Sequence, residues 1–262
     1  MPHPPRRHVL HEANLHQLQD DRPNTPVLPW AATEGHGYHL PHGTDVIEAT
    51  ALGEASVRKA NEQGAKCLLL PTVPFGNDNM QLDQVATITM RSSTQQAVLR
   101  DVAESLVRQG FDRMVVLNFH GGNEFKQMIR DIMLDLPIFI MQIMGYMVAD
   151  WSAHVTVRDG DHASEFETSL MLHLTPQWVD MSVAADGAYA KNTYESFGTP
   201  GVWFPRDWAA LTESTGTGDP RQASAANGQK IFNLLVDAVA PILRDLSRAS
   251  PGEFPFIVPR AR

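Results

Sequence analysis

The sequence predicts an α/β protein, in which a mostly parallel central sheet is covered by helices on both faces, a three-layer α/β/α arrangement. Short apolar runs alternate with amphipathic helical patterns along the chain, and this strand–helix–strand order is typical of parallel sheets. The apolar runs lack an alternating polar face, which indicates strands buried on both sides. We expect one domain over residues 1–262, with 1–24 as an N-terminal extension and 248–262 as a peripheral tail.

The first half of the chain contains two of these strands and one long helix. A short strand is predicted at 27–30, and a polar, histidine-rich loop follows it. A helix then begins with Thr44 as its N-cap and continues until Gly64 stops it. The run KCLLLPTV at 66–73 is predicted to be a buried strand. Its cysteine, Cys67, is the only one in the chain and is interpreted as a small core residue.

The middle of the chain continues the alternation. A helix is expected at 93–109, where apolar residues recur every three to four positions. The run RMVVLNF at 113–119 is predicted to be the next strand. Asn123 is expected to cap a helix that reaches Asp135, and a further strand follows at 138–143.

The last third of the chain is less regular. A short helix is predicted at 165–174 and a long amphipathic helix at 224–246, but residues 181–219 show no clear period. Three methionines near the last strand are expected in the core: Met141, Met144 and Met147. Six aromatic side chains of the irregular stretch could line a pocket or a subunit interface, and the sequence leaves both open. They are Tyr189, Tyr194, Phe197, Trp203, Phe204 and Trp208.

Composition and charge exclude several classes of protein. The 262 residues are 43% hydrophobic and 19% charged, which excludes a disordered chain. The net charge of −9 argues against a nucleic-acid partner, which needs a basic surface. The most apolar stretch, 137–149, is too short to cross a bilayer, and the N-terminus does not resemble a signal peptide. We therefore expect a soluble, cytoplasmic protein without a membrane partner.

The first polar cluster, TEGHGYHLPHGTD, directly follows the first strand, where α/β sheets place their ligand crevices. Glu34 and His36 are two residues apart and point to the same side of an extended chain, while Asp45 opens the next helix. Two carboxylates and an imidazole suit Zn, Mn or Fe(II). The alternative is a polar loop in which Asp45 only favours the helix N-terminus. His39 and His42 are expected to be solvated loop residues.

A second cluster, NFHGGN, lies at the carboxyl end of the predicted strand 113–119. It places His120 at the strand end and Gly121 and Gly122 at the turn into the next helix. Glycines at such a turn let a substrate approach backbone N–H groups. The alternative is an ordinary strand-to-helix turn with an incidental histidine.

A third cluster, DHASEFETS, lies at the start of the short helix. Ser164 and Glu167 fit a capping box, which would give Glu167 a purely structural role. His162 and Glu165 are not explained in this way. Because they are three residues apart around a helix start, the two side chains can converge on one site, and Asp161 could orient the histidine.

Together, the three clusters resemble the creatininase (creatinine amidohydrolase) family. The motifs EGHGxHLPxGTD, NxHGGN and HAxExETS occur in the order that the family shows, over about residues 27–176. The resemblance implies a creatininase-like three-layer fold, often a homohexamer, with one or two divalent metals (Zn, Mn or Fe) per subunit. It also implies that His162 is the acid/base for the leaving group and that Asp45 bridges when two metals bind. Four residues would be metal ligands: Glu34, His36, Asp45 and His120.

The chain departs from the creatinine-hydrolysing members at several positions. Those enzymes carry a Glu two residues after the His of the second motif, where this chain has Gly122. Members with the HGGN form carry a Glu three residues after the later His. The resemblance therefore assigns the remaining ligand and catalytic role to Glu165, with Glu167 as second choice. The family's Trp-containing loop and its Pro-Gly-Thr are replaced at 157–160 and 83–87, which argues against creatinine itself.

We therefore expect a metal-dependent hydrolase that cleaves an amide-like C–N bond of a small polar molecule, such as a cyclic amide or lactam. The metal would lower the pKa of a bound water and polarise the carbonyl, and His162 would protonate the leaving nitrogen. Asp78, Gly121 and Gly122 are expected to contact the substrate. Alternatives in the same fold are a deformylase, a peptidase or a C–C bond hydrolase acting on a cyclic keto-polyol. A binding protein that has lost turnover is the alternative from another class.

Overall fold

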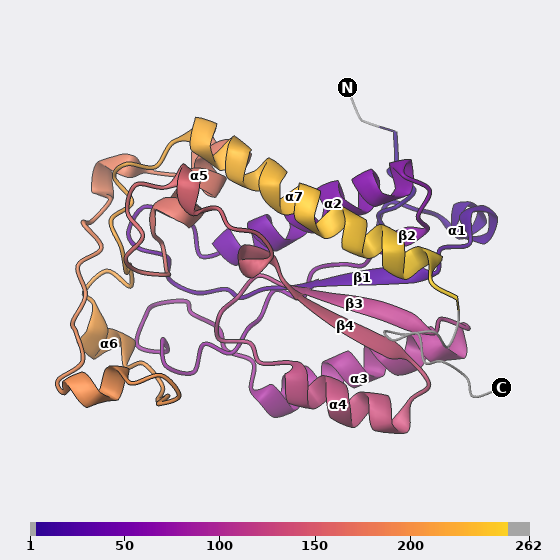
Figure 1. Cartoon of the computed structure of the whole chain (residues 1–262), viewed down its shortest axis with the longest axis horizontal. Helices are drawn as coiled ribbons and strands as arrows, with labels where there is room; N and C mark the ends of the chain where they lie inside the picture. Colours follow the sequence, from indigo (N-terminus) through magenta and orange to yellow (C-terminus); the bar gives the residue numbers. More distant parts are fainter. Residues whose placement is uncertain (1–3, 251–262) are drawn as a thin grey trace.

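The central element of the fold is a four-stranded parallel sheet with strand order β2-β1-β3-β4 (Figure 1). The computed structural model describes residues 4–250, so most of the predicted C-terminal tail lies outside the described residues. Parallel pairing joins β1 to β2, β1 to β3 and β3 to β4, with Val27 opposite both Leu69 and Val115. The strands are β1 (Thr25–Trp30), β2 (Cys67–Leu69), β3 (Arg113–Asn118) and β4 (Phe139–Met144).

Helices cover both faces of this sheet, which confirms the predicted fold class (Figure 1). One face carries α2 (Thr44–Glu62), α5 (Glu165–Leu174) and α7 (Ala225–Arg248). The other face carries α3 (Ser92–Arg108) and α4 (Lys126–Asp135). Shorter elements are α1 (Leu15–Asp21), α6 (Trp208–Leu211) and the 3-10 turns η1 (Gly145–Met147), η2 (Ser152–His154), η3 (Pro176–Trp178), η4 (Met181–Val183) and η5 (Glu195–Gly198).

Strand β3 shows why the apolar runs lack a polar face. Val115 and Leu117 belong to the apolar cluster under α2, α5 and α7, whereas Met114 and Val116 belong to the cluster under α3 and α4. Side chains alternate between the two faces of a strand, and here both faces are buried. Within residues 4–250, no helix is long and apolar enough to cross a membrane.

Two predicted helix starts are wrong. The N-cap of α2 is Gly43, and Thr44 is instead the first helical residue, whose Oγ1 donates to the Pro41 carbonyl at 2.7 Å. Asn123 does not cap α4, which begins at Lys126. The Asn123 side chain accepts hydrogen bonds from the Asn77 N–H and the Gln95 amide and donates one to Asn118. It therefore joins a loop, helix α3 and strand β3 instead of capping a helix.

The predicted core residues are mostly in place. Cys67 is buried as expected, and burial raises the pKa of its thiol to about 12. Met141 is partly buried and packs against the core. Met147, however, is 68% exposed, because β4 has already ended and the residue lies in η1. The core prediction for Met147 is therefore wrong.

The stretch 184–217, which we call the 184–217 segment, crosses the region beyond the carboxyl ends of the strands (Figure 1). Two antiparallel backbone hydrogen bonds join Thr217 to His162, and the Ala190 N–H donates to the Leu211 carbonyl at 2.7 Å. The helical elements of the segment are one 3-10 turn, η5, and the short helix α6. It is therefore held by contacts to other parts of the chain more than by its own secondary structure.

Candidate metal centre

The first two polar clusters meet at the carboxyl edge of the sheet. Glu34 lies in the loop after β1, and His120 follows the neighbouring strand β3 by two residues. Helices α2 and α5 begin at the same edge, with Asp45 and Glu167 in their first turns. Because parallel strands end at one edge of a sheet, side chains far apart in the sequence converge there.

The converging side chains form three groups with metal-ligand character. In each group the potential ligand atoms lie within 4.8 Å of one another. The groups are Glu34–Asp45–His120, His36–Asp45–Glu167 and Glu34–His36–His162. Asp45 belongs to two of them: its Oδ1 lies 2.9 Å from His36 Nε2 and its Oδ2 lies 2.9 Å from His120 Nδ1. The two oxygens of this one carboxylate thus face two different imidazoles.

The residues present fit a divalent metal. Asp45 Oδ2 and His36 Nε2 are buried, and neither has a partner in hydrogen-bond geometry among the described residues. Buried polar atoms normally find such partners. Mixed carboxylate and imidazole donors are the ligands that Zn, Mn and Fe(II) accept in proteins. The unpartnered atoms and the donor set therefore both favour a metal centre over a polar loop.

The electrostatics of the cluster point the same way. Burial raises the pKa of Glu34 and of Glu167 to about 7. Burial disfavours the charged form of His36, but the neighbouring Asp45, and then Glu167 and Glu34, outweigh it and raise its pKa to about 10. Without a metal, protons held by these side chains therefore reduce the negative charge of the buried cluster. Metal binding displaces protons from such ligands.

His162 enters the cluster from the loop before α5. Its Nε2 lies 2.8 Å from the carbonyl oxygen of Gly35, which can only accept, so Nε2 carries the hydrogen. The lone pair of Nδ1 is then free, 3.8 Å from Glu34 Oε1. Burial, and then the charge of His36, lower the pKa of His162 to about 3. The ring of Trp208 in α6 lies 4.8 Å from the His162 ring.

Asp78, which we expected to contact the substrate, lies beside His120. It is buried, and its Oδ1 lies 2.9 Å from His120 Nε2. The opposite nitrogen of His120, Nδ1, lies 3.0 Å from Glu34 Oε1. A carboxylate on the far nitrogen of a ligand histidine fixes its tautomer and orientation. In this position Asp78 could orient His120.

The two glycines after His120 have different surroundings. A Cβ on Gly122 would stand 2.3 Å from the Asn77 carbonyl oxygen and 2.5 Å from His120 Nε2, so close backbone packing requires this glycine. A Cβ on Gly121 would meet only the hydroxyl of Tyr146, at 3.7 Å. Of the two, only Gly121 leaves open space beside the cluster.

The expected ligand Glu165 does not join the three groups. Its Oε2 accepts the N–H groups of Thr156 at 2.7 Å and Val157 at 2.8 Å, which holds the loop that precedes α5. Glu167, the second choice, is the carboxylate in the group with His36, and its Oε1 lies 3.9 Å from His36 Nε2. The geometry thus favours Glu167 over Glu165 as a ligand.

The capping box that would have explained Glu167 does not form. Ser164 is the N-cap of α5, but its side chain makes no capping hydrogen bond. Glu167 Oε2 instead accepts a hydrogen bond from the Ala163 N–H, one residue before the cap. The predicted capping box of Ser164 and Glu167 is therefore wrong.

His39 is buried, so the prediction that it is solvated is wrong. Its Nε2 lies 2.8 Å from Thr168 Oγ1 in α5. Burial, and then the charge of His36, lower the pKa of His39 to about 4. His42 is partly exposed, and its Nε2 lies 2.9 Å from the Val85 carbonyl oxygen. His39 thus joins the first cluster to the helix of the third.

Sequence reasoning missed two residues beside the cluster. Glu48 follows Asp45 by one helical turn and is buried without a hydrogen bond to the described residues. Burial, and then the charges of Glu167 and Asp45, raise its pKa well above the usual range. The i, i+3 spacing from Asp45 was a usable signal. Thr215, whose hydroxyl donates to the Gly35 carbonyl at 2.9 Å, gave none, because 180 residues separate the partners.

The aromatic residues of the 184–217 segment have different surroundings. Trp208 lies against His162, whereas Trp203 is 83% exposed.

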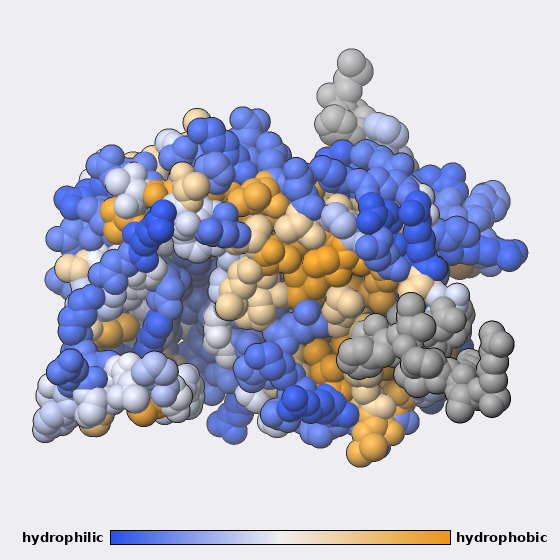
Figure 2. Space-filling view, in the orientation of Figure 1, coloured by the Kyte–Doolittle hydropathy of each residue, from blue (hydrophilic) through white to orange (hydrophobic). Residues whose placement is uncertain are grey.

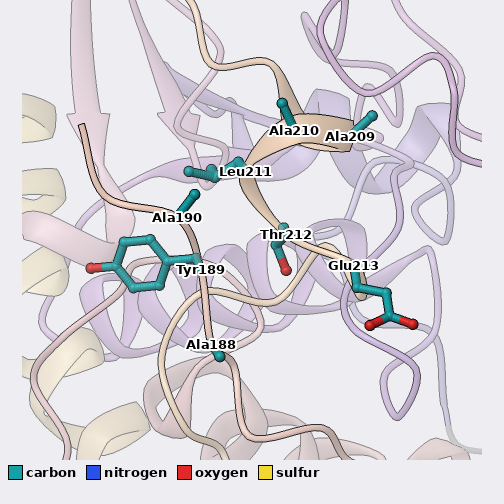
Figure 3. Close-up of a pocket in the computed structure, with 8 residues that line it drawn as sticks. All are labelled: Ala188, Tyr189, Ala190, Ala209, Ala210, Leu211, Thr212 and Glu213. Atoms are coloured by element: carbon teal, nitrogen blue, oxygen red, sulfur yellow. The ribbon is translucent and has the colours of Figure 1, made fainter. Parts of the chain in front are cut away.

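A cavity of about 430 Å³ opens within the segment (Figure 3). It is lined by Tyr189, Leu211, Thr212, Glu213 and the alanines Ala188, Ala190, Ala209 and Ala210. No residue of the three ligand groups lines this cavity, so it is separate from the candidate metal centre.

Comparison with known proteins agrees with this geometry. The profile of the Creatininase family, described as creatinine amidohydrolase, matches residues 10–243. A mycofactocin precursor peptide peptidase from Mycobacterium ulcerans is 29% identical over 86% of both chains. Creatinine amidohydrolase from Pseudomonas putida is 27% identical, over 84% of this chain and 88% of that one.

Solved structures give the same result. A Bacteroides fragilis protein assigned by name to creatinine amidohydrolase is 33% identical, with a TM-score of 0.87 over 92% of this chain and 97% of that chain. A structure named as the Mn form of creatininase is 21% identical, with a TM-score of 0.75 over 92% of this chain and 99% of that chain, and shares the fold.

Proposed function

The chain belongs to the creatininase family of metal-dependent amidohydrolases, and we propose that it holds two divalent ions and hydrolyses a C–N bond of a small polar molecule. The observation that carries the proposal is the position of Asp45. Each of its oxygens lies 2.9 Å from a different imidazole, on His36 and on His120. In this position Asp45 would be a ligand shared by the two groups, which supports a two-metal site.

The ligand groups divide naturally between two ions. Glu34, Asp45 and His120 would hold one, and His36, Asp45 and Glu167 the other. When bound, the ions would supply a water of lowered pKa and a polarised substrate carbonyl. Creatinine-hydrolysing members carry a Glu at the position of Gly122, and in this chain Glu167 would supply a ligand carboxylate instead.

His162 would transfer the proton. Its ring is neutral, with the hydrogen on Nε2 held by Gly35 and the lone pair on Nδ1 facing the cluster. Nδ1 takes a proton from the attacking water as its oxygen bonds to the carbonyl carbon. The same nitrogen then gives that proton to the leaving nitrogen as the C–N bond breaks. Thr215 donates to the same Gly35 carbonyl and so supports the position of His162.

Metal analysis tests the proposal directly. The wild type, purified without chelator, should contain about two equivalents of divalent metal, and Asp45→Ala should lose both because it removes the shared ligand. Asp180→Asn, a change in an exposed carboxylate of the η4 cap, is the matched control and should keep both. Wild-type protein that binds no metal, even when Zn or Mn is added, would overturn the proposal.

A short peptide is the second candidate substrate. It is favoured by the similarity to mycofactocin precursor peptide peptidases, which is as high as that to a creatinine amidohydrolase. Comparing kcat/KM for creatinine, simple lactams, N-formyl compounds and short peptides separates the candidates. Turnover of peptides alone would replace the small-molecule proposal.

We further propose that the protein forms a homohexamer and acts in the cytoplasm. Among the described residues β4 is an edge strand, and Figure 2 shows an apolar band on the surface between α7 and the α3–α4 pair. Apolar bands of this kind mark subunit contacts. Light scattering on the purified protein should give about six times the chain mass of 29.0 kDa, and a monomer mass would contradict the assembly.

A further inference from the structure

Tyr146 lies at the mouth of the candidate metal centre without an assigned role. It follows β4 in the turn η1, at the sheet edge where His120 follows β3. Its hydroxyl stands 3.7 Å from where a Cβ of the exposed Gly121 would lie. This hydroxyl makes no hydrogen bond to any residue within 4–250. A polar group therefore faces the open space beside the metal ligands.

The position of Tyr146 is fixed by its packing. Its ring contacts Phe119 edge-on, with centroids 6.0 Å apart, and its backbone carbonyl accepts the Trp151 indole N–H at 2.8 Å. Trp151 in turn lies 4.3 Å from the Phe166 ring. Gly145 lets the chain pass close by, since a Cβ there would stand 2.5 Å from Phe119. The hydroxyl is thus held in place before any substrate arrives.

The hydroxyl also keeps its proton. Burial raises the pKa of Tyr146; the charge of His120 opposes this, and the carboxylates of Asp161, Asp45 and Glu167 add to it, so that the pKa is raised overall. The same charges show that the phenol lies within electrostatic reach of the ligand cluster. A neutral phenol is a hydrogen-bond donor over the pH range in which a hydrolase of this type works.

We propose that Tyr146 donates a hydrogen bond to the carbonyl oxygen of the substrate. The bond strengthens as that oxygen takes the electron pair of the C=O bond during attack by water, which is how oxyanion donors lower barriers. Tyr146 keeps its proton throughout. The C–N bond then breaks, the carbonyl re-forms, and the leaving nitrogen receives its proton from His162. This inference rests on the hydrolase function proposed above.

Kinetics of Tyr146→Phe test the role. The variant removes one oxygen and keeps the ring on Phe119, so metal content and Tm should stay as in wild type. We expect kcat to fall about 100-fold on any compound that the wild type turns over, with KM within about twofold. Tyr194→Phe is the matched control, because Tyr194 is 62% exposed and its ring packs edge-on against the ring of Phe197. Unchanged kcat, a rise in KM alone, or loss of metal in Tyr146→Phe would each overturn the proposal.

A binding measurement gives a readout that does not depend on turnover. Acetohydroxamate binds metal centres as an anion, so its oxygen carries negative charge like the oxygen formed during attack and unlike the ground-state carbonyl, and its Kd can be measured by calorimetry on the metal-loaded proteins. Tyr146→Phe should bind it about tenfold more weakly, the effect of one hydrogen bond, whereas Tyr194→Phe should match wild type. Equal Kd values in all three proteins would overturn the role of Tyr146 alone. Absence of metal and turnover in wild type would instead overturn the hydrolase proposal.

Discussion

The helices on the two faces of the sheet carry different residues in their first turns. Helices α2 and α5 place Asp45, and Glu165 with Glu167, in their first turns, whereas α3 and α4 have no acidic residue there. The buried side chains of α4 are all apolar: Met128, Ile129 and Ile132. The same sheet thus has one face that only stabilises the fold and one that also holds the candidate site.

This difference has an energetic consequence. Burying a carboxylate is unfavourable unless a cation or hydrogen bond compensates, and burial raises the pKa of Glu34, Glu167 and Glu48. The α3–α4 face has no such cost, and its apolar burial stabilises the protein. Substitutions on the two faces should therefore separate activity from stability, and four predictions test this.

The largest effect is expected for activity in His162→Ala. Loss of the acid/base should lower kcat about 100- to 10,000-fold while both metal equivalents remain, because His162 is outside the two proposed ligand sets. Steady-state kinetics and metal analysis measure these quantities. His16→Ala, which removes an 84% exposed imidazole on α1, should leave both unchanged. Turnover within a few-fold of wild type in His162→Ala would mean that this histidine is not the proton carrier.

The opposite face should show the reverse effect in Ile132→Ala. Ile132 is a fully buried residue of α4 that packs in the core on this face of the sheet, so its truncation should lower the free energy of unfolding by about 2–5 kcal/mol. Metal per folded chain and kcat should not change. Urea unfolding measures the loss, and Leu134→Ala, at an 86% exposed position of the same helix, is the control. A loss of metal in Ile132→Ala would show that the two faces are coupled.

A third prediction separates the two glutamates of α5. Glu167→Gln should lose about one of two metal equivalents, because an amide is a poor ligand in place of a carboxylate, and kcat should fall about tenfold or more. Glu165→Gln should keep both metals but lower Tm, because its buried carboxylate accepts two backbone N–H groups. The reverse pattern in metal analysis would make Glu165 the ligand.

The smallest effect concerns pH. The pKa of His36 is raised to about 10 in the metal-free fold, so its stabilising contribution is complete below about 6.5 and is lost as the pH rises towards 10. Glu34 and Glu167, with pKa values of about 7, act with the same sign from about pH 4.5 upward. His162 has the opposite sign, but only between about pH 3 and 6.5.

Thermal melts at pH 7 and pH 10 check this prediction. The Tm of metal-free protein should fall between these values by more than the Tm of metal-loaded protein, because bound metal replaces the protons. The metal-loaded protein is the control for all groups outside the cluster. Parallel curves for the two forms would show that the ligand cluster does not contribute to the pH dependence.

Much of the site could be predicted from residue types and spacing. The alternation of strands and helices placed the clusters of Glu34, Asp45 and His120 at strand ends and helix starts, and the fold brings these three together. The choice between Glu165 and Glu167 could not be made in this way. Two residues along a helix correspond to about 200° of rotation, so the two carboxylates point in nearly opposite directions. Which of them faces the cluster depends on how α5 packs.

Local patterns thus determined the order of the elements, the sheet type and the positions of the polar clusters, because periodicity and capping act over a few residues. Only the tertiary structure decided which side chains close the site. His162 meets Gly35 across 127 residues, and His39 meets Thr168 across 129. Such contacts depend on how helices and loops pack against the sheet, which no short-range pattern encodes. Asp78 behind His120 and Tyr146 beside Gly121 became recognisable only once the chain had folded.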